Sequence, residues 1–440
     1  MLARSCKMLR GVAQGFVANG NRHLTQKPSL VRACRRLQHV QASSHVGDVI
    51  TSIERCDDKA WYEVRWADGH TAHFPYVFLF DNCRCADCYH TGSYQRAVLM
   101  ADVDPDIQPT GHSIVGNGEA IQVSWPNGHS SPFPADWLKR HEFGKKPYDP
   151  LASLTKKSWG SEKAADIPVF KYDDVMEDDK ALYDWLASLM TDGITLLKET
   201  RGEEGVVDKI CKRIAWIRTT IYGNVFNVIT MYDACSLAYT GNALGMHNDL
   251  PGFYYTPGVQ MLHCIKQVES EGGDNQFVDG LRMAEVILQE DPRMFEILKT
   301  MKIDFRTVGE EYIPYHVMTR RSLFEFDEEG NFKGINYNDG VRAPYWSLPV
   351  EQIQDGYRAL KTFHRTMYSE DNFINYKLQK GEMVVFDNRR ILHGRHGFRV
   401  EVQEGEESKM RHLEGAYLDW DEIKSKMRLI YEDVHGIPRF

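Results

Sequence analysis

Two histidines and one aspartate have the types and spacing of a mononuclear iron site. One residue separates His247 from Asp249 in the segment His247-Asn248-Asp249. On an extended segment, residues i and i+2 point to the same side, so this imidazole and carboxylate can converge on one ion. A second histidine, His393, follows the apolar run 383–386. Two histidines and one carboxylate leave three coordination positions open, which suits Fe(II) that must bind a co-substrate and O₂.

Arg411 is a candidate for binding an anionic co-substrate beside that iron. It follows His393 at a spacing of eighteen residues. A guanidinium binds a carboxylate through two parallel hydrogen bonds, so a 2-oxo-dicarboxylate could chelate iron at one end and contact Arg411 at the other. A lone His-x-Asp motif is a weak signal, because the chain has 17 histidines and a surface histidine is the ordinary alternative. The ordinary alternative for Arg411 is a solvated surface charge.

The cysteines indicate a second metal site of a different kind. The chain has nine cysteines, an odd count, and three of them lie within six residues: Cys83, Cys85 and Cys88. That spacing suits a metal better than a disulfide framework. A fourth ligand would close a tetrahedral Zn(II) site, which leaves no position for a substrate and would therefore stabilise a small domain. His90, His112 and His129 are open as the fourth ligand, and three buried, unligated thiols are the alternative.

The elements that must position the iron ligands are expected after residue 169. Apolar residues at helical spacing predict helices at about 182–189, 207–214 and 350–367, and again after Asp419. Apolar runs predict strands at 193–197 and 383–386. The expected fold class is therefore mainly β with α (α+β), with helices packed around a β-core, in a domain at 169–440.

A smaller β-rich domain is expected at 48–145. Polar and apolar residues alternate in short runs through 48–80, and the segment 67–70 interrupts them as a hairpin turn would. A second strand-like run at 120–125 precedes another turn sequence. Residues 146–168 lack a clear period and are rich in Lys, Pro, Ser and Asp, which predicts a linker. No internal repeat is apparent in the sequence.

The first 47 residues differ in charge from the rest of the chain. They contain eight Lys or Arg but no Asp or Glu, and apolar residues recur among them at helical spacing. A basic, acid-free, amphipathic N-terminus is typical of a mitochondrial transit peptide, so residues 1–47 are expected to direct the chain to the mitochondrial matrix. A disordered basic tail on a cytoplasmic protein is the alternative.

Charge and hydropathy exclude two classes of partner. The whole chain carries a formal charge of −9, and without residues 1–47 it carries 45 − 62 = −17. An acidic body is a poor candidate for binding nucleic-acid phosphates. No apolar run approaches the roughly 18 residues that a membrane span needs.

Residues from about 169 to 432 resemble the 2-oxoglutarate-dependent, non-haem iron dioxygenases. Within these, the chain is similar to the γ-butyrobetaine dioxygenase and trimethyllysine dioxygenase family of carnitine biosynthesis. The segments that carry the resemblance are 258–266, 272–274, 278–280, 385–388, 392–394 and 411–420, and in the smaller domain 66–70 and 81–89. The segment 411–420 resembles γ-butyrobetaine dioxygenase more than its trimethyllysine relative.

The resemblance implies a double-stranded β-helix, a jelly-roll form, for the catalytic domain. It implies His247, Asp249 and His393 as Fe(II) ligands and Arg411 as the residue that binds 2-oxoglutarate. It also implies that His129 is the fourth zinc ligand. A homodimer and ascorbate, as an aid in keeping the iron reduced, follow from the same resemblance.

The resemblance further implies an aromatic cage for a quaternary ammonium substrate. Such a cation has no hydrogen-bond donor and is best held against aromatic faces. The residues at the cage positions are Tyr222, Phe226, Tyr239 and Tyr417. Each of them taken alone fits an ordinary core aromatic better than a cage residue, and the joint match to the family positions favours the cage.

Two positions depart from the pattern of γ-butyrobetaine dioxygenase. Phe226 stands where that enzyme has Trp, and Ser236 stands where it has a carboxamide expected to help hold the substrate carboxylate. Asn338 matches the other carboxamide. These departures concern which betaine is bound and leave the reaction type unchanged.

The function expected from the resemblance is oxidoreductase chemistry, the hydroxylation of γ-butyrobetaine to L-carnitine with 2-oxoglutarate and O₂. Trimethyllysine hydroxylation is the first alternative, and the predicted transit peptide favours it. A paralogue acting on another betaine is the second. A catalytically inactive, zinc-binding interaction protein is the alternative from another class, although such a protein has no chemical need for the iron ligands and Arg411 together.

Overall fold

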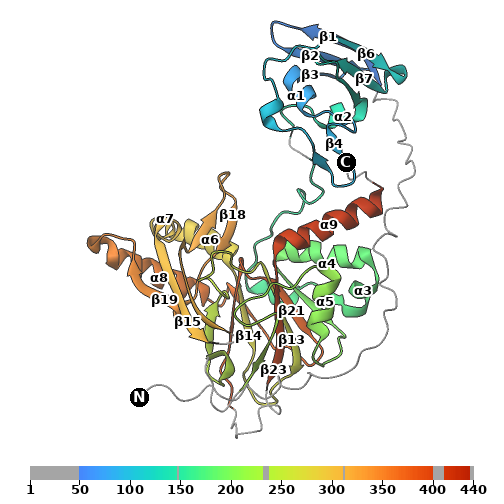
Figure 1. Cartoon of the computed structure of the whole chain (residues 1–440). Coiled ribbons are helices and arrows are strands. Elements are labelled where there is room, and N and C mark those ends of the chain that lie inside the picture. The colour runs from blue at the N-terminus through green and yellow to red at the C-terminus, as the bar shows by residue number, and fades with distance from the viewer. Residues whose placement is uncertain (1–48, 146–147, 231–236, 311–312, 400–410, 437–440) are drawn as a thin grey trace, which may run out of the picture. The chain divides into compact units, whose positions relative to one another are not determined.

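The computed structural model describes residues 49–145, 148–230, 237–310, 313–399 and 411–436 (Figure 1). The predicted transit peptide and Ser236 therefore lie outside the described residues. The chain divides into two compact units, Met1–Pro147 and Tyr148–Phe440. No helix in the described parts of the chain is long and apolar enough to cross a membrane.

The first unit is built from two copies of one β-β-β-α arrangement. β1 (Ile50–Cys56), β2 (Trp61–Trp66) and β3 (Thr71–Pro75) form an antiparallel sheet followed by α1 (Tyr76–Asp81). β6 (Gly111–Val115), β7 (Ala120–Ser124) and β8 (Ser130–Pro134) form a second one, followed by α2 (Ala135–Arg140). Between them lies a short hairpin of β4 (Tyr89–His90) and β5 (Gln95–Arg96).

The two copies are offset by 59 residues, so the prediction of no internal repeat was wrong. Trp66 corresponds to Trp125 (125 − 66 = 59), and Phe74 to Phe133 (133 − 74 = 59). All four side chains are buried in one shared core. The hairpin turns match as well, because Trp66 N–H and Trp125 N–H each donate to the carbonyl four residues on, at 2.9 Å. The repeat is difficult to recognise in the sequence, because only scattered turn and aromatic residues are identical between the two copies.

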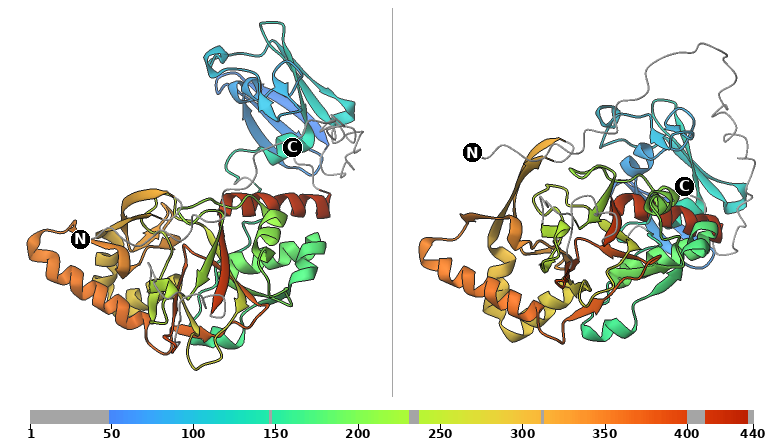
Figure 2. Two further views of the ribbon diagram at one scale, coloured as in Figure 1. Left: turned by 60° about the horizontal axis from the view of Figure 1, so that its bottom comes forward. Right: turned by 90° about the horizontal axis from the view of Figure 1, so that it is seen from below.

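Two facing sheets form the centre of the second unit (Figures 1 and 2). The larger has six strands in the order β11-β23-β13-β21-β10-β9 and the smaller has four in the order β12-β22-β14-β20. The larger sheet contains β9 (Val169–Lys171), β10 (Ile194–Lys198), β11 (Val225–Ile229), β13 (Val259–Lys266), β21 (Met383–Asp387) and β23 (His412–Leu418). The smaller contains β12 (Leu244–His247), β14 (Asn275–Asp279), β20 (Phe373–Tyr376) and β22 (Ile391–Arg395). Apolar side chains of both sheets meet in one core, as in a jelly roll.

Helices cover the outer faces of these sheets. α4 (Asp179–Asp192), α5 (Val206–Ile214) and α9 (Trp420–His435) pack with outward residues of β13, β21 and β23. α6 (Gly280–Glu290), α7 (Pro292–Thr300) and α8 (Ile353–Met367) pack with residues of the smaller sheet. α3 (Tyr172–Glu177) precedes α4. The predicted helices near 182–189, 207–214, 350–367 and after Asp419 are thus confirmed, as are the strands near 193–197 and 383–386.

A three-stranded sheet, which contains a long hairpin, and a two-stranded sheet complete the second unit. β15 (Lys302–Glu310) pairs with β16 (Pro314–Ser322) and with β19 (Arg342–Trp346). β17 (Phe324–Phe326) pairs with β18 (Phe332–Ile335). Residues 148–168, within the predicted linker, lie in this unit: Leu151 and Trp159 are buried, and Trp159 Nε1–H donates to the Asp192 carbonyl at 2.7 Å.

Candidate functional site

Strand pairing brings the two histidines of the predicted iron site together. β12 and β22 run antiparallel, and His247 is the direct partner of His393. Their ring centroids are 4.5 Å apart. Asp249 lies just beyond the end of β12, with Oδ1 3.2 Å from His247 Nε2. One ligand atom from each residue lies within 4.8 Å of the others, so the three side chains can bind one ion.

Two buried asparagines hold the segment that carries Asp249. Asn248 N–H donates to the Tyr337 carbonyl at 2.9 Å, and Asn248 Oδ1 accepts from Tyr337 N–H at 2.7 Å. Asn388 Oδ1 accepts from Asp249 N–H at 2.8 Å, and Asn388 Nδ2 donates to the Asp249 carbonyl at 3.0 Å. Sequence reasoning assigned no role to either asparagine. The only signal was that both lie inside motif segments.

The unpaired ring nitrogens fit a metal ion. His247 Nδ1 bonds the Gly245 carbonyl at 2.8 Å, which leaves Nε2 directed towards Asp249. His393 Nδ1 is buried and has no hydrogen-bond partner among the described residues. Buried polar atoms are normally paired, so a missing partner at this point suits a metal ligand. Two imidazoles and one carboxylate are the donor set that non-haem Fe(II) prefers.

Charge is finely balanced among these three residues. Burial, with a smaller effect of the neighbouring His247, lowers the pKa of His393 to about 3. Burial alone would raise the pKa of Asp249, but the hydrogen bond with His247 and the nearby His393 hold it well below its usual range. Asp249 is therefore an anion at neutral pH and His393 a neutral ring, which are the protonation states that metal ligands need.

Arg411 is deeply buried, which excludes the alternative of a solvated surface charge. It is 2% exposed, and its Nη2 donates to Asn275 Oδ1 at 3.1 Å. Its Nε has no hydrogen-bond partner in the described parts of the chain. Burial lowers the pKa of Arg411 to about 9, and the nearby Arg395 contributes. Within the described residues no Asp or Glu forms an ion pair with Arg411, so a bound carboxylate is the fitting counter-ion.

Arg395 supports the segment that carries Tyr239. Its guanidinium donates to the carbonyls of Ala238, Thr240 and Asn242 at 3.0, 2.6 and 2.8 Å. Sequence reasoning did not single out Arg395, although it follows His393 by two residues on β22. It therefore connects the strand that carries a predicted iron ligand with a segment predicted to contact substrate.

Three of the four predicted cage residues form one aromatic cluster. Phe226 stacks on Tyr417 with ring centroids 5.1 Å apart and an interplanar angle of 28°, and Tyr222 lies 5.8 Å from Phe226. Burial is the main cause that raises the pKa of Tyr417, and the neighbouring Tyr222 and Tyr239 add to it. Because such an effect requires proximity, Tyr239 lies near this cluster. Phe253 and Tyr315 also pack here, and sequence reasoning missed both.

Tyr417 also contacts the predicted iron ligand. Its hydroxyl donates to Asp249 Oδ2 at 2.6 Å. Gly415, two residues before it, is the cross-strand partner of Phe226. A Cβ at Gly415 would lie 2.5 Å from the Phe226 ring, so the glycine leaves the space that this ring occupies. The aromatic cluster and the predicted iron ligands are therefore directly connected.

Asn338 follows the residue that anchors Asn248. Its side chain is half-buried, and its Oδ1 accepts from Gly340 N–H at 3.0 Å. The Nδ2 group of Asn338 is then the part of the amide available to donate to a carboxylate. Ser236, the other predicted contact for the substrate carboxylate, lies outside the described residues.

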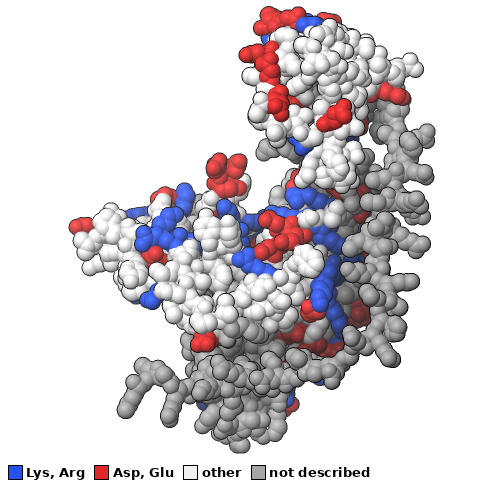
Figure 3. Space-filling model, in the orientation of Figure 1, with Lys and Arg blue, Asp and Glu red and all other residues white. Residues whose placement is uncertain are grey.

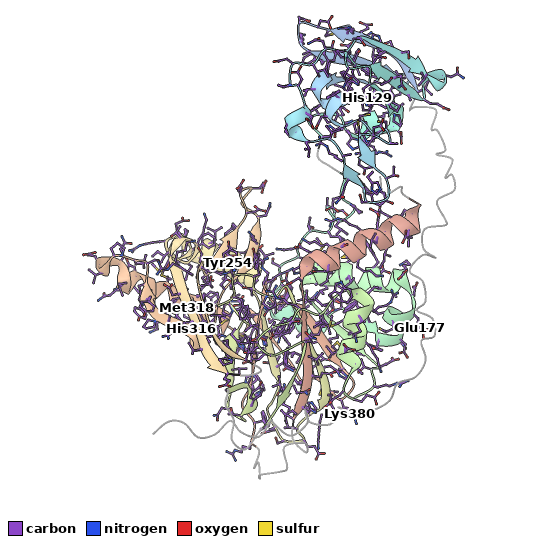
Figure 4. The ribbon with its side chains drawn as sticks, viewed as in Figure 1. His129, Glu177, Tyr254, His316, Met318 and Lys380 are labelled. Atoms are coloured by element: carbon purple, nitrogen blue, oxygen red, sulfur yellow. The ribbon has the colours of Figure 1, made fainter. Side chains whose placement is uncertain are left out.

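The three clustered cysteines and His129 meet in the first unit. Figure 4 marks the position of His129 in that unit. The distances from His129 Nε2 to the Sγ atoms of Cys83, Cys88 and Cys85 are 3.2, 3.4 and 3.7 Å. A tetrahedral Zn(II) with normal bond lengths separates a nitrogen and a sulfur ligand by roughly 3.5 Å. Burial and the neighbouring Cys83 raise the pKa of Cys88 to about 12, so a cation is needed to hold three thiolates together.

The other two candidate histidines are engaged elsewhere. His90 Nδ1 bonds Ser93 Oγ at 2.7 Å, and the His112 ring packs edge-on against Tyr62 at 5.0 Å. The internal repeat also relates His129 to His70 (129 − 70 = 59), and Cys83 to Glu142 (142 − 83 = 59). His70 Nε2 lies 3.0 Å from Glu142 Oε2, so a histidine–carboxylate contact occupies the positions that the repeat relates to His129 and Cys83.

A large open cleft in the second unit contains none of the predicted site residues. Its volume is about 1050 Å³. Seven Lys or Arg and five Asp or Glu side chains line it, and such mixed charge is visible on this face (Figure 3). The exposed rings of Tyr254 and Tyr255, a few residues after Asp249, stand at this cleft.

Comparison with known proteins gives consistent matches over nearly the whole chain. Residues 149–417 match the family described as taurine catabolism dioxygenase TauD, TfdA family. Residues 53–139 match the family described as γ-butyrobetaine hydroxylase-like, N-terminal.

Named relatives of two kinds are similar to the chain. γ-Butyrobetaine dioxygenase of Homo sapiens is 35% identical over 394 residues, which is 88% of this chain and 98% of the relative. γ-Butyrobetaine dioxygenase of Pseudomonas sp. (strain AK-1) is 32% identical over 83% of this chain and 93% of the relative. The mitochondrial trimethyllysine dioxygenase of Bos taurus is 29% identical over 84% of this chain and 85% of the relative.

Proposed function

Because the chain belongs to the TauD/TfdA family of dioxygenases, we propose that it hydroxylates γ-butyrobetaine to L-carnitine with Fe(II), 2-oxoglutarate and O₂. The observation that carries the substrate class is the contact between Tyr417 and Asp249. An aromatic cluster that is hydrogen-bonded to an iron ligand can hold a trimethylammonium group beside the reacting centre.

The metal and co-substrate supply the oxidising power, and the chain binds and orients the reactants. Fe(II) with 2-oxoglutarate and O₂ hydroxylates an unactivated C–H bond and releases succinate and CO₂. His247, Asp249 and His393 would hold the iron. Arg411, oriented by Asn275, would bind the distal carboxylate of 2-oxoglutarate through two hydrogen bonds.

The cage and Asn338 would select the substrate. The rings of Tyr222, Phe226, Tyr239 and Tyr417 present negative faces to the trimethylammonium group. Asn338 Nδ2–H would donate to the carboxylate at the other end of the betaine. Fixing both ends of a short, flexible molecule decides which carbon faces the iron, because position in such sites controls reactivity.

Trimethyllysine is the rival substrate, because relatives of that name also match most of the chain. Trimethyllysine carries an α-amino group as well as a carboxylate, so its binding site needs an additional hydrogen-bond acceptor. Phe226 and Ser236 raise a different betaine as a further possibility. A catalytically inactive zinc protein would leave without a purpose the buried Arg411, whose Nε has no hydrogen-bond partner among the described residues.

Turnover assays with the purified chain test this function. Fe(II), ascorbate and 2-oxoglutarate are supplied, γ-butyrobetaine or trimethyllysine is offered, and succinate and hydroxylated product are measured together. We expect coupled turnover with γ-butyrobetaine and its loss in His247→Ala. His396→Ala, at an exposed histidine three residues after His393, is the matched control and should keep the activity. Turnover with neither substrate would overturn the proposal.

We propose that a bound zinc ion stabilises the first unit. We further propose that the chain consists of a transit peptide at 1–47, a zinc-binding domain at 48–147 and a dioxygenase domain at 148–440. The boundary at residue 47 rests on the change in charge. The boundary before the second unit lies at 147/148 instead of the predicted 168/169, because residues 148–168 pack into the second unit. The convergence of three Sγ atoms and His129 Nε2 supports a closed Zn(II) site. Metal analysis should find about one zinc per chain.

We also propose that the chain is imported into mitochondria and that it forms a homodimer. The acid-free basic segment 1–47 and a relative named as mitochondrial support import to the matrix. Imaging of a tagged chain with and without residues 1–47 tests the first, and light scattering of the purified protein tests the second. A fall in activity when ascorbate is omitted would support its role.

A further inference from the structure

Gln260 is a buried amide that none of the roles above uses. It lies in β13 and is 2% exposed. Its Oε1 is buried and has no hydrogen-bond partner among the described residues. Turning the amide over would only put Nε2 in the same place, so one polar group stays unpaired in either orientation. A buried unpaired polar group calls for an explanation, and a ligand that supplies the partner is one.

Both cross-strand neighbours of Gln260 contact iron ligands. β13 lies between β23 and β21, and the partners of Gln260 are Tyr417 and Phe386. The Tyr417 hydroxyl donates to Asp249 at 2.6 Å. The Phe386 ring centroid lies 4.9 Å from that of His393. Gln260 therefore lies on the larger sheet beside the three metal ligands.

The same face of β13 extends from the iron ligands to Arg411. Successive residues alternate between the two faces of a strand, so Gln260, Leu262 and Cys264 share one face. Leu262 and Cys264 pack in the core between the two sheets, and Val259 and Met261 pack against the helices on the other side. Burial raises the pKa of Cys264 to about 11 while the Arg411 charge opposes that rise, which places Cys264 near Arg411.

This face offers a polar group near each of its two ends. Four residues of strand span about 13 Å, from Gln260 at the iron end to Cys264 at the Arg411 end. A 2-oxo-dicarboxylate that chelates iron and reaches the Arg411 side chain would lie along this face. A trimethylammonium group, by contrast, has no donor for Oε1 and no acceptor for Nε2, so it cannot satisfy the amide.

We infer that the Gln260 amide binds the iron-chelating end of 2-oxoglutarate. That end carries a carboxylate and a keto oxygen, and both accept hydrogen bonds. The amide, turned so that Nε2 faces the ligand, donates to one of them. This role rests on the proposed function, and it makes Gln260 a co-substrate-binding residue that pairs with Arg411 at the opposite end.

Binding of a co-substrate analogue tests this role without turnover. The full chain is loaded with Mn(II), and the dissociation constant of N-oxalylglycine is measured by calorimetry for the wild type, Gln260→Leu and Gln260→Glu. The melting temperature of each metal-free protein is measured beside it. Met261→Leu is the matched control, because it changes the same strand on the opposite face.

Opposite effects on affinity and stability are expected. Gln260→Leu should raise the dissociation constant of N-oxalylglycine about tenfold, the size expected for one lost hydrogen bond to a charged group. It should leave the affinity for Mn(II) alone unchanged, and the melting temperature unchanged or higher. Gln260→Glu should weaken binding further, because a second anion repels the ligand. Met261→Leu should bind as the wild type does.

Two results would overturn the inference. One is an analogue affinity of Gln260→Leu within twofold of the wild type. The other is a loss of melting temperature greater than that of Met261→Leu, which would assign the amide to the fold. If the wild type itself fails to bind N-oxalylglycine, the proposed function falls and this role falls with it. If wild type and variants bind equally well, only the role of Gln260 falls.

Discussion

At the scale of single residues, Tyr417 makes two contacts that belong to different tasks. Its hydroxyl donates to Asp249 Oδ2, and its ring stacks on Phe226. A hydrogen bond to a metal-binding carboxylate fixes which oxygen faces the ion. The ring, meanwhile, forms one wall of the proposed cage. In the proposed site one side chain would set both substrate position and metal geometry, and the two tasks can be separated by mutation.

Tyr417→Phe should weaken metal binding while keeping the ring. The loss of a partner to a metal-ligating carboxylate typically costs 10- to 100-fold in metal affinity, so a rise of about tenfold in the dissociation constant of Mn(II) is expected. Calorimetry with Mn(II) measures it. Tyr222→Phe is the control, because it removes another tyrosine hydroxyl of the same aromatic cluster. Equal metal affinity in Tyr417→Phe and the wild type would contradict this prediction.

Phe226 and Gly415 should change substrate affinity in opposite directions. Phe226→Trp enlarges the aromatic face and should lower the KM for γ-butyrobetaine about threefold or more, because Trp is the best cation–π partner. Gly415→Ala places a Cβ 2.5 Å from the Phe226 ring, which must move, so the KM should rise. Steady-state kinetics at saturating 2-oxoglutarate measures both. A KM that moves the same way in both variants would count against the cage.

At the scale of elements, β13 serves two purposes on its two faces. Its inner face carries Gln260 towards the iron ligands, and its outer face carries the fully buried His263. His263 Nε2 lies 2.7 Å from Thr200 Oγ1, and Glu414 on β23 accepts from the first backbone N–H groups of α5. The outer face thus fixes α5 against the sheet, which in turn holds the inner face in place.

His263 should make stability fall on acidification. Burial, with a smaller effect of His412, lowers the pKa of His263 to about 4. Its unfolded value is about 6.5. Between these values the unfolded chain binds a proton that the folded chain does not, so the free energy of unfolding falls as pH drops from about 6.5 to 4. Urea unfolding at several pH values should show a shallower dependence for His263→Gln, and an identical slope would refute this.

At the scale of the whole molecule, the two units obtain their stability in different ways. The second unit encloses a large apolar core between two sheets and their helices. The first is a small pair of β-β-β-α copies with one core. Small domains have less apolar surface to bury, so a structural metal contributes more to them. The repeat also explains the position of the cysteine cluster, because α1 of the first copy is followed by Cys83, which meets His129 of the second.

Removing the metal should therefore destabilise the first unit selectively. Cys88→Ser should lower the zinc content below about one per chain and move one calorimetric transition to lower temperature. The transition of the second unit should stay where it is. Cys264→Ser changes a buried cysteine of the second unit and provides the control for zinc content. Full zinc content in Cys88→Ser would contradict the assignment of this ligand.

Features that depend on residues close together could be predicted from the sequence. The helix α4 follows from Leu182, Trp185, Leu186 and Leu189 on one face, because helical spacing is a local property. His247 and Asp249 could be chosen as ligands because two residues on an extended segment share a side. The three clustered cysteines are recognisable for the same reason.

Relations between distant segments were decided only by the tertiary structure. His247 and His393 are 393 − 247 = 146 residues apart, and only the β12–β22 register makes them partners. The hydrogen bonds of Asn388 and Tyr417 with Asp249 also join segments far apart in the sequence. The same holds for the convergence of His129, rather than His90 or His112, with the three cysteines.

The sequence alone thus determined which chemical groups this protein has, because residue types and short spacings are written in it directly. The tertiary structure decided which of those groups meet and which are left without a partner. Burial makes Arg411 and Gln260 informative, since an unpaired polar group is ordinary in water and costly in a core. No local pattern encodes that difference, because it depends on strands brought together from across the chain.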